Sequence, residues 1–153
     1  MGDLPAGSTV KALDTPSTVS NAQSATVSTT STTYATAGTD CAVVFTAPTT
    51  GRVMIHLSAR MTLSAGSTSG ALMSPQTRTG GVVGSGTIVE DAADQTAVSH
   101  YGGTAFERQG IWHLLSNLTP GAVYNTRLLM ALSSGGTGTA SFAHRELIVS
   151  PAT

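Results

Sequence analysis

From residue 40 onwards, turns rich in glycine and proline divide the sequence into short segments of high strand propensity. Glycine, proline, asparagine and aspartate favour turns because their backbone preferences suit tight reversals of the chain. No window has the spacing of an amphipathic helix. Short strands at such regular spacing predict an antiparallel β-sandwich of about eight strands. We expect these strands near residues 41–46, 52–61, 70–78, 86–90, 96–101, 110–116, 123–132 and 139–149.

The clearest of these strands covers residues 52–61, because apolar and polar side chains alternate along it. One face carries only apolar residues, which we expect in the core: Val53, Ile55, Leu57, Ala59 and Met61. The other face has arginine and histidine side chains with a methionine in the middle. We expect it to be a subunit contact, rather than a catalytic or nucleic-acid surface, formed by Arg52, Met54, His56 and Arg60.

The strands at 123–132 and 139–149 carry apolar residues on both faces. Simple alternation places Leu129 and Ala131 opposite Leu128, and it places Phe142 and Ile148 opposite Leu147 and Val149. Strands of this kind are typical of a sheet whose outer face is also covered. A neighbouring subunit is the simplest cover, and this pattern therefore predicts a homo-oligomer.

A turn closed by Pro120 and Gly121 comes directly before Tyr124 at the start of a strand. This arrangement resembles the tyrosine corner of fibronectin type III domains, in which the tyrosine hydroxyl bonds to backbone a few residues upstream. An immunoglobulin or fibronectin type III-like sandwich is therefore an alternative to a jelly roll.

The N-terminal part of the chain differs in composition from the rest. Residues 1–20 carry two prolines and little periodicity, which is typical of an extended arm. Residues 21–39 are rich in Ser and Thr, and we expect an edge strand or an ordered arm there. The chain thus divides into an N-terminal arm and edge segment, residues 1–39, and a sandwich head, residues 40–153.

The composition excludes several classes of partner. Only 10% of the residues are charged, the net charge is −1, and 25 Thr and 18 Ser supply most of the polarity, so we expect no nucleic-acid partner. No segment approaches the roughly 20 apolar residues of a membrane span, and the first residues do not resemble a secretory signal. Cys41 is the only cysteine, so no intrachain disulfide forms, and we expect it buried in its apolar surroundings.

Catalytic signals are weak throughout the chain. There is no G-x-S-x-G nucleophile motif, and we expect neither enzymatic activity nor a cofactor. His144 and Glu146 share a strand face and are expected to form a surface contact rather than a catalytic dyad. The acidic loop from Glu90 to Asp94 lacks a calcium-binding pattern, and the sequence leaves open whether it holds an ion.

Two aromatic residues receive opposite assignments. Trp112 lies in an apolar strand and is expected in the core, whereas Tyr101, beside His100 and two glycines, is the best candidate for an outward contact. We therefore predict an outward contact at His100 and Tyr101.

The segments LPAGSTVKALDTPSTV, FTAPTTGRVMIHLSAR, RTGGVVGSGT and LTPGAVYNTRL resemble small virion structural proteins of tailed bacteriophages of actinobacteria, of the minor tail or decoration type. The turn from Phe45 to Gly51 and the strand after it are loosely similar to trimeric jelly-roll heads of the complement and tumour-necrosis-factor kind. The end of the chain departs from the closing pattern of those heads.

These resemblances imply a virion structural protein without enzymatic activity, made in the host cytoplasm and located in the virion. We expect a homo-oligomer, as a trimer, attached to other virion proteins through the N-terminal arm. A host cell-surface glycan is a further expected partner, and no membrane is expected. Tail tip and capsid surface both remain open as locations. The alternative function is a free carbohydrate-binding module that acts on cell-wall glycan.

Overall fold

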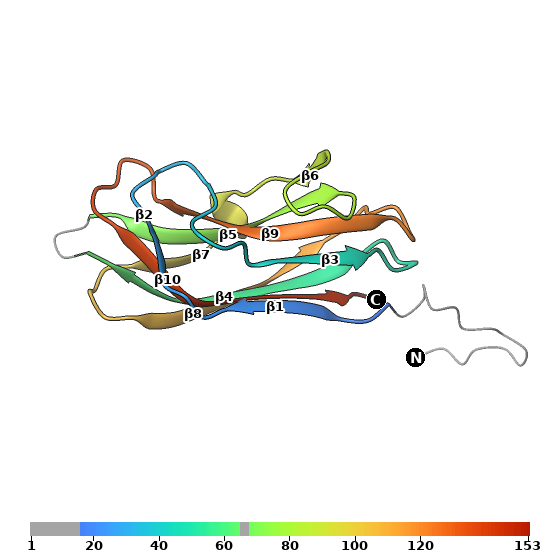
Figure 1. The fold of residues 1–153 in the computed structure, drawn as a ribbon, viewed down its shortest axis with the longest axis horizontal. Helices are drawn as coiled ribbons and strands as arrows, with labels where there is room; N and C mark the ends of the chain where they lie inside the picture. Colours follow the sequence, from blue (N-terminus) through green and yellow to red (C-terminus); the bar gives the residue numbers. More distant parts are fainter. Residues whose placement is uncertain (1–15, 65–67) are drawn as a thin grey trace, which may run out of the picture.

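The computed structural model describes residues 16–64 and 68–153, and within them two antiparallel sheets pack face to face (Figure 1). Most of the predicted N-terminal arm, residues 1–15, lies outside the described residues. Sheet A contains β1 (Val19–Gln23), β10 (Ala140–Pro151), β4 (Val53–Leu63) and β8 (Glu107–Leu115) in that order, with β2 (Val27–Thr29) also paired to β10. Sheet B contains β3 (Ala42–Thr46), β9 (Val123–Leu132), β5 (Gly70–Thr79) and β6 (Ile88–Glu90), with β7 (Val98–Tyr101) also paired to β5. A short 3₁₀ turn, η1 (Asp94–Thr96), precedes β7.

The order of the strands is that of a jelly roll. The chain changes sheet between β3 and β4, between β4 and β5, and again at each step from β7 to β10. In an immunoglobulin fold, by contrast, the last two strands are neighbours in one sheet. The predicted sandwich is therefore confirmed, and each of the eight predicted segments contains a strand.

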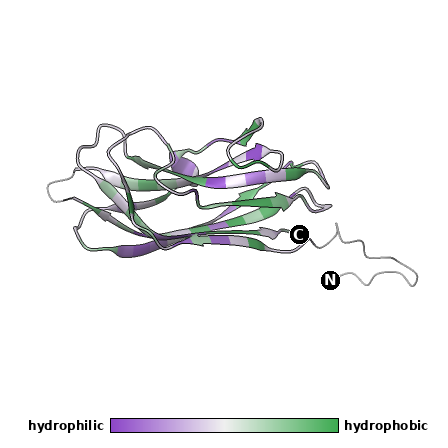
Figure 2. Cartoon of the chain, viewed as in Figure 1, coloured by the Kyte–Doolittle hydropathy of each residue, from purple (hydrophilic) through white to green (hydrophobic). Residues whose placement is uncertain are grey.

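The core lies between the sheets and contains the predicted face of β4. Val53, Ile55, Leu57, Ala59 and Met61 are each at most 2% exposed, which confirms the alternation. Figure 2 shows hydrophobic residues along the strands of both sheets. Cys41 is fully buried beside this core, as expected, and burial raises the pKa of its thiol to about 11.

A β-bulge interrupts the pairing of β10 with β4. Ala143 pairs with Arg60 and Glu146 pairs with Ser58, so two residues of β10 lie opposite one residue of β4. The extra residue shifts the alternation. As a result Phe142, Leu147 and Val149 are all buried in the core. Our expectation that Phe142 and Leu147 occupy opposite faces is therefore wrong.

Part of the outer face of sheet B is covered by the chain itself, although Val44 and Val123 on the same face stay exposed. Leu129 and Ala131 on that face are at most 4% exposed without any partner chain. The Tyr34 hydroxyl, from the segment beside β9, donates a hydrogen bond of 2.9 Å to Asp94 in η1, and η1 contacts β5. A neighbouring subunit is therefore not needed to bury Leu129 and Ala131, contrary to our expectation for this strand.

The Ser/Thr-rich segment is ordered and lies at the edge of sheet A. β1 and β2 both pair with β10, and Ala35 forms a bridge to Met130 of β9. The prediction of an edge strand in residues 21–39 is confirmed, and pairing begins at Val19.

The tyrosine corner is also present. The backbone N–H of Thr119 donates to the Tyr124 hydroxyl over 2.9 Å, and the Tyr124 ring stacks on Phe45 with centroids 5.8 Å apart. This local motif therefore occurs here within a jelly-roll strand order.

Candidate functional site

The outer face of sheet A, here called the sheet A surface, is the part of the described molecule that most resembles a binding site. Cross-strand pairs place Met54 beside Leu114, and His56 between Ile148 and Trp112. We call these five residues the apolar half. Further along the same strands lies the polar half, which comprises Ser58, Arg60, Arg108, His144 and Glu146.

Trp112 is the most exposed residue of the apolar half. It is 63% exposed, and its ring packs against the His56 ring with centroids 4.5 Å apart and an angle of 37° between the planes. Our expectation that Trp112 lies in the core is wrong. β8 is apolar on both faces, and at the edge of the sheet its pairing directs Ile111 and Leu115 inward while Trp112 and Leu114 face outward.

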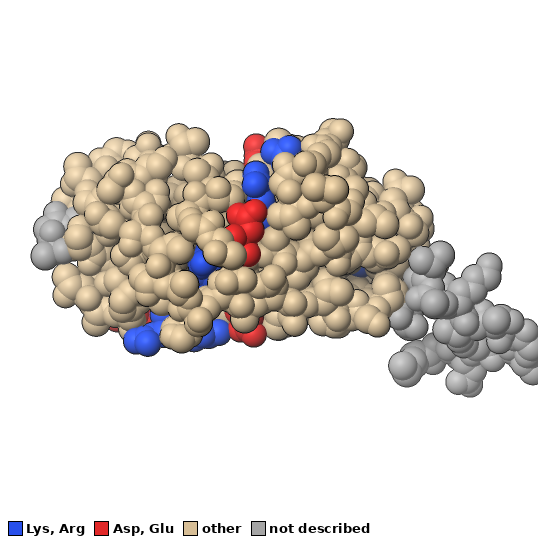
Figure 3. Space-filling view, in the orientation of Figure 1, with Lys and Arg blue, Asp and Glu red and all other residues tan. Residues whose placement is uncertain are grey.

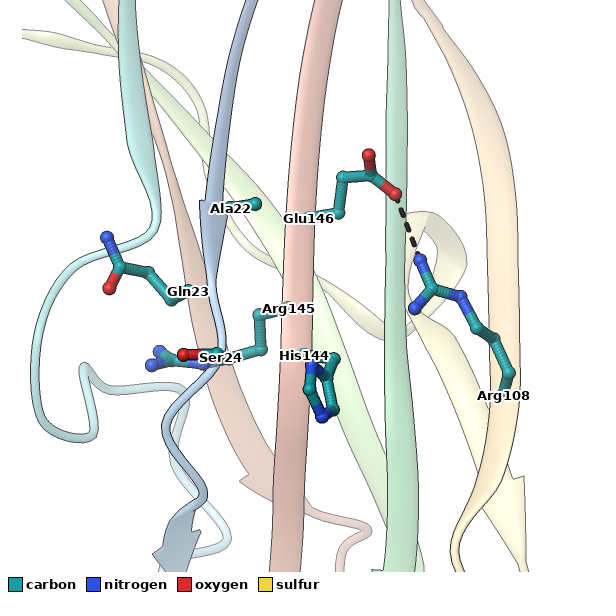
Figure 4. Close-up of a pocket in the computed structure, with 7 residues that line it drawn as sticks. All are labelled: Ala22, Gln23, Ser24, Arg108, His144, Arg145 and Glu146. Carbon is teal, nitrogen blue, oxygen red and sulfur yellow. Dashed lines mark hydrogen bonds and ion pairs between the residues drawn. The ribbon is translucent and has the colours of Figure 1, made fainter.

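An ion pair organises the polar half. Arg108 Nη2 donates to Glu146 Oε2 over 2.9 Å (Figure 4). It also donates to Ser58 Oγ over 2.8 Å. Ser58 Oγ donates in turn to the same carboxylate oxygen over 3.2 Å, and Ser58 is only 4% exposed. The three side chains come from adjacent strands, so this network fixes the carboxylate above β10. His144 and Glu146 both border this region, but Glu146 takes Arg108 rather than His144 as its partner.

The bulge in β10 gives His144 an unusual backbone conformation. Its φ is +49°, in the left-handed region, which costs a residue other than glycine about 1–2 kcal/mol. The His144 side chain is exposed and borders a cavity of about 320 Å³. Figure 4 shows the residues that line this cavity, here called the bulge pocket: Ala22, Gln23, Ser24, Arg108, His144, Arg145 and Glu146. Bulges with backbone strain of this kind are frequent at functional sites.

Arg145, the second residue of the bulge, turns inward. It is 1% exposed, and its Nη1 donates to the carbonyl oxygens of Thr39 at 3.1 Å and Ala37 at 3.5 Å. Loss of water around the guanidinium lowers its pKa, and the nearby Cys41 and Asp40 oppose this shift. Nε and Nη2 have no hydrogen-bond partner among the described residues. Arg145 therefore attaches the turn before β3 to β10, and sequence alternation alone did not reveal this role.

The residues predicted for a subunit contact lie on or beside the sheet A surface. Met54 and His56 are half-buried within the apolar half. Arg60 is exposed in the polar half, with its guanidinium 5.5 Å from the centre of the Phe106 ring. Arg52 lies just before β4 and donates to the carbonyl oxygen of Thr153 over 3.1 Å.

Of the two residues predicted to form an outward contact, only Tyr101 faces outward. Tyr101 is 67% exposed on sheet B, but His100 is 4% exposed and lies 3.5 Å from the Glu107 carboxylate. Neighbouring residues of a strand point to opposite faces, so both side chains cannot face outward. The assignment of His100 to an outward contact is therefore wrong.

The acidic loop uses its carboxylates for internal bonds. Glu90 lies 2.7 Å from the His113 ring nitrogen, Asp91 accepts a hydrogen bond of 2.7 Å from Gln76, and Asp94 accepts from Tyr34. Burial first, and then this bond, raise the pKa of Tyr34. Among residues 16–64 and 68–153, no three potential metal-ligating side chains gather in one place.

Charged side chains occupy little of the visible surface. Figure 3 shows the acidic and basic residues of one face in a narrow band across its middle and in a second group along its lower left edge. No helix in the described part of the chain has the length and apolar character needed to cross a membrane.

A scan against protein-family models found no match, and a search of curated proteins found none either.

Proposed function

We propose that the chain is a non-enzymatic structural protein of a tailed-bacteriophage particle, whose β-sandwich head assembles with copies of itself, as a trimer, through the apolar half of the sheet A surface. The observation that carries assembly is the exposure of Trp112, at 63%, on the outward face of the edge strand β8. The particle itself is inferred from the resemblance in sequence and from the low charge and high Ser and Thr content.

The two outer faces of the sandwich differ in a way that supports assembly. The loops of the chain bury Leu129 and Ala131 on sheet B, whereas Trp112 and Leu114 on sheet A stay 63% and 38% exposed. Exposed apolar clusters of this kind mark interaction sites. A second copy would cover the apolar half and remove its side chains from water, as the loops do for Leu129 and Ala131 on sheet B.

Trp112 supplies enough apolar area to dominate such a contact. A tryptophan side chain buries up to about 250 Å², so covering its exposed part removes about 160 Å² from water, or about 4 kcal/mol per subunit. Association opposes this gain with lost rotational and translational freedom. Tryptophan is nevertheless the residue type most enriched among those that dominate binding energy.

Sedimentation equilibrium of the purified full chain tests the assembly. Trp112→Ser and Met54→Asp should shift the trimer towards monomers, because each replaces an apolar contact with a polar group. Tyr101→Ser is the matched control, since Tyr101 is equally exposed but lies on sheet B. A wild-type chain that is monomeric, or an oligomer that neither sheet A variant weakens, would refute assembly through this surface.

Immunogold electron microscopy of particles from a phage that encodes this chain tests the location. Label at the tail tip or over the capsid shell would support a virion role and would choose between the two places. Absence of the chain from purified particles, judged by mass spectrometry, would refute that role.

The alternative of a free carbohydrate-binding module has less support from the described surface. Such a module would need two or three exposed aromatic residues on one face. The described residues place Trp112 on sheet A and Tyr101 on sheet B, so the two do not form one platform. Binding to cell-wall glycan by a monomeric wild-type chain would favour this alternative over the assembly proposed above.

A further inference from the structure

The bulge pocket is a cavity bordered by a residue with a strained backbone conformation. The extra residue in β10 forces His144 into the left-handed region at a φ of +49°, where glycine would fit without strain. In this conformation the exposed imidazole of His144 lies beside the cavity. In Figure 4 the cavity lies between Ala22 and Ser24 on one side and the Arg108–Glu146 pair on the other, with β10 as its floor.

Several polar groups around the cavity lack partners within the described chain. Glu146 Oε1, both ring nitrogens of His144, and Nε and Nη1 of Arg108 make no hydrogen bond to any described residue, while the ion pair holds Glu146 Oε2 and Arg108 Nη2 in place. A carboxylate oxygen only accepts and a guanidinium only donates. The cavity therefore offers fixed acceptors and fixed donors side by side.

The exposed charges that line the cavity form an ion pair. Arg108 faces Glu146 at 2.9 Å, whereas Arg145, which also lines the cavity, is buried and donates from Nη1 to the carbonyl oxygens of Thr39 and Ala37. A small anion would meet the Glu146 carboxylate and a small cation would meet Arg108, so neither gains a net attraction. A neutral ligand with several hydroxyl groups suits this arrangement, because each hydroxyl both donates and accepts.

The size of the cavity limits the ligand. About 320 Å³ lies at the lower end of the range for small-molecule pockets, which is sufficient for one sugar ring and too small for an enclosed oligosaccharide. Ala22 gives one wall an apolar methyl group that can face the C–H side of such a ring. We propose that the bulge pocket binds a single neutral sugar residue, through Glu146, Arg108 and His144.

This inference rests on the proposed function only for its setting, a head displayed on a phage particle, for which the resemblance in sequence makes a host glycan an expected partner. The residues that bind the sugar belong to the polar half, whereas assembly uses the apolar half. The two proposals can therefore fail separately, and the experiment below measures both on the same samples.

Amide NMR of the full chain, titrated with the methyl glycosides of glucose, galactose and mannose and with N-acetylglucosamine, tests the site. At least one sugar should give saturable shifts at residues 22–24 and 144–146, with millimolar affinity. Glu146→Gln should weaken that affinity about tenfold, as expected for loss of a hydrogen bond to a charged group. His144→Gly should also weaken it, and this variant keeps the backbone conformation because glycine favours a positive φ. Trp112→Ser and Arg60→Gln, which lie outside the pocket lining, should leave affinity unchanged.

Three results would overturn the inference: no saturable shift with any of the sugars up to about 50 mM, well above the weakest useful affinity; shifts with phosphate or acetate but with no sugar; or sugar-dependent shifts centred on Trp112. Light scattering of the same samples separates the proposals. Trimers that bind no sugar refute only the pocket, and monomers that bind sugar at residues 144–146 refute only the assembly.

Discussion

Replacement of His144 by glycine should stabilise the fold, although it removes a side chain. The φ of +49° costs a non-glycine residue about 1–2 kcal/mol, and His144 makes no hydrogen bond to a described residue that would be lost. Glycine loses about 0.5–1 kcal/mol through its greater freedom in the unfolded chain. The net gain lies between about 0 and 1.5 kcal/mol, and its central value of about 0.75 kcal/mol corresponds to a rise in Tm of about 1.5–3 °C for a domain of this size.

Urea denaturation of wild type and His144→Gly measures this gain directly. Two control variants bracket it. Asn117→Gly, at a φ of +63°, should gain less because asparagine tolerates this region, and Ala143→Gly within β10 should lose about 0.5–1 kcal/mol. If His144→Gly loses as much stability as Ala143→Gly, the left-handed conformation carries no strain, and strain does not mark the bulge as a functional site.

Three further changes test other parts of the fold. Tyr124→Phe should lower the free energy of unfolding by about 1–2 kcal/mol, because it leaves the Thr119 N–H without its 2.9 Å partner; equal urea midpoints would contradict this. The pKa of Cys41 rises from 9.0 to about 11 on folding, so the protonated thiol stabilises the fold fully below pH 9.0, and this contribution is lost as the pH rises through about 11. The free energy of unfolding of wild type should therefore fall by about 2–3 kcal/mol relative to Cys41→Ala across that interval, whereas parallel pH curves would exclude it. Asn125→Ala removes a donor to the Gly80 carbonyl and an acceptor for the Gly84 N–H, each at 3.0 Å. Hydrogen exchange at the Gly84 amide should therefore accelerate. Unchanged exchange would show that the loop from Gly80 to Gly84 stays ordered without the Asn125 side chain.

Alternation in the sequence predicted the strands and one core face, but it did not predict which face of an apolar edge strand points inward. β4 alternates strictly, so its burial followed from the period alone. In β8, apolar residues occur on both faces, and only the pairing with β4 directs Trp112 outward. His100 was misassigned for a related reason, since exposure of Tyr101 requires its neighbour to face the core.

The bulge in β10 was not predictable from residue types. Its residues, Ala143 to Glu146, include neither the glycine nor the asparagine that commonly mark a positive φ. The bulge changed the face of every residue after it, so the predicted contrast between Phe142 and Leu147 failed. It also produced the two features of the candidate site that sequence reasoning missed, the inward Arg145 and the strained His144.

The two outer faces of the sandwich use the chain in different ways, and this difference separates assembly from ligand binding. On sheet B, loop residues satisfy the outward polar side chains, as in the 2.8 Å bond between Ser74 and Thr96 and the 2.7 Å bond from Gln76 to Asp91. The chain itself covers this part of the face, whereas Val44 and Val123 at its other end stay exposed. On sheet A, the strands carry an exposed apolar cluster around Trp112 and an ion pair beside a cavity at Arg108. Trp112 and Arg108 are four residues apart on β8, so at about 3.3 Å per residue the cluster and the ion pair lie roughly 13 Å apart. A contact centred on Trp112 can therefore bury the apolar half while the bulge pocket stays open at its border. For this reason Trp112→Ser should change the mass of the assembly without changing sugar affinity, and His144→Gly should do the reverse.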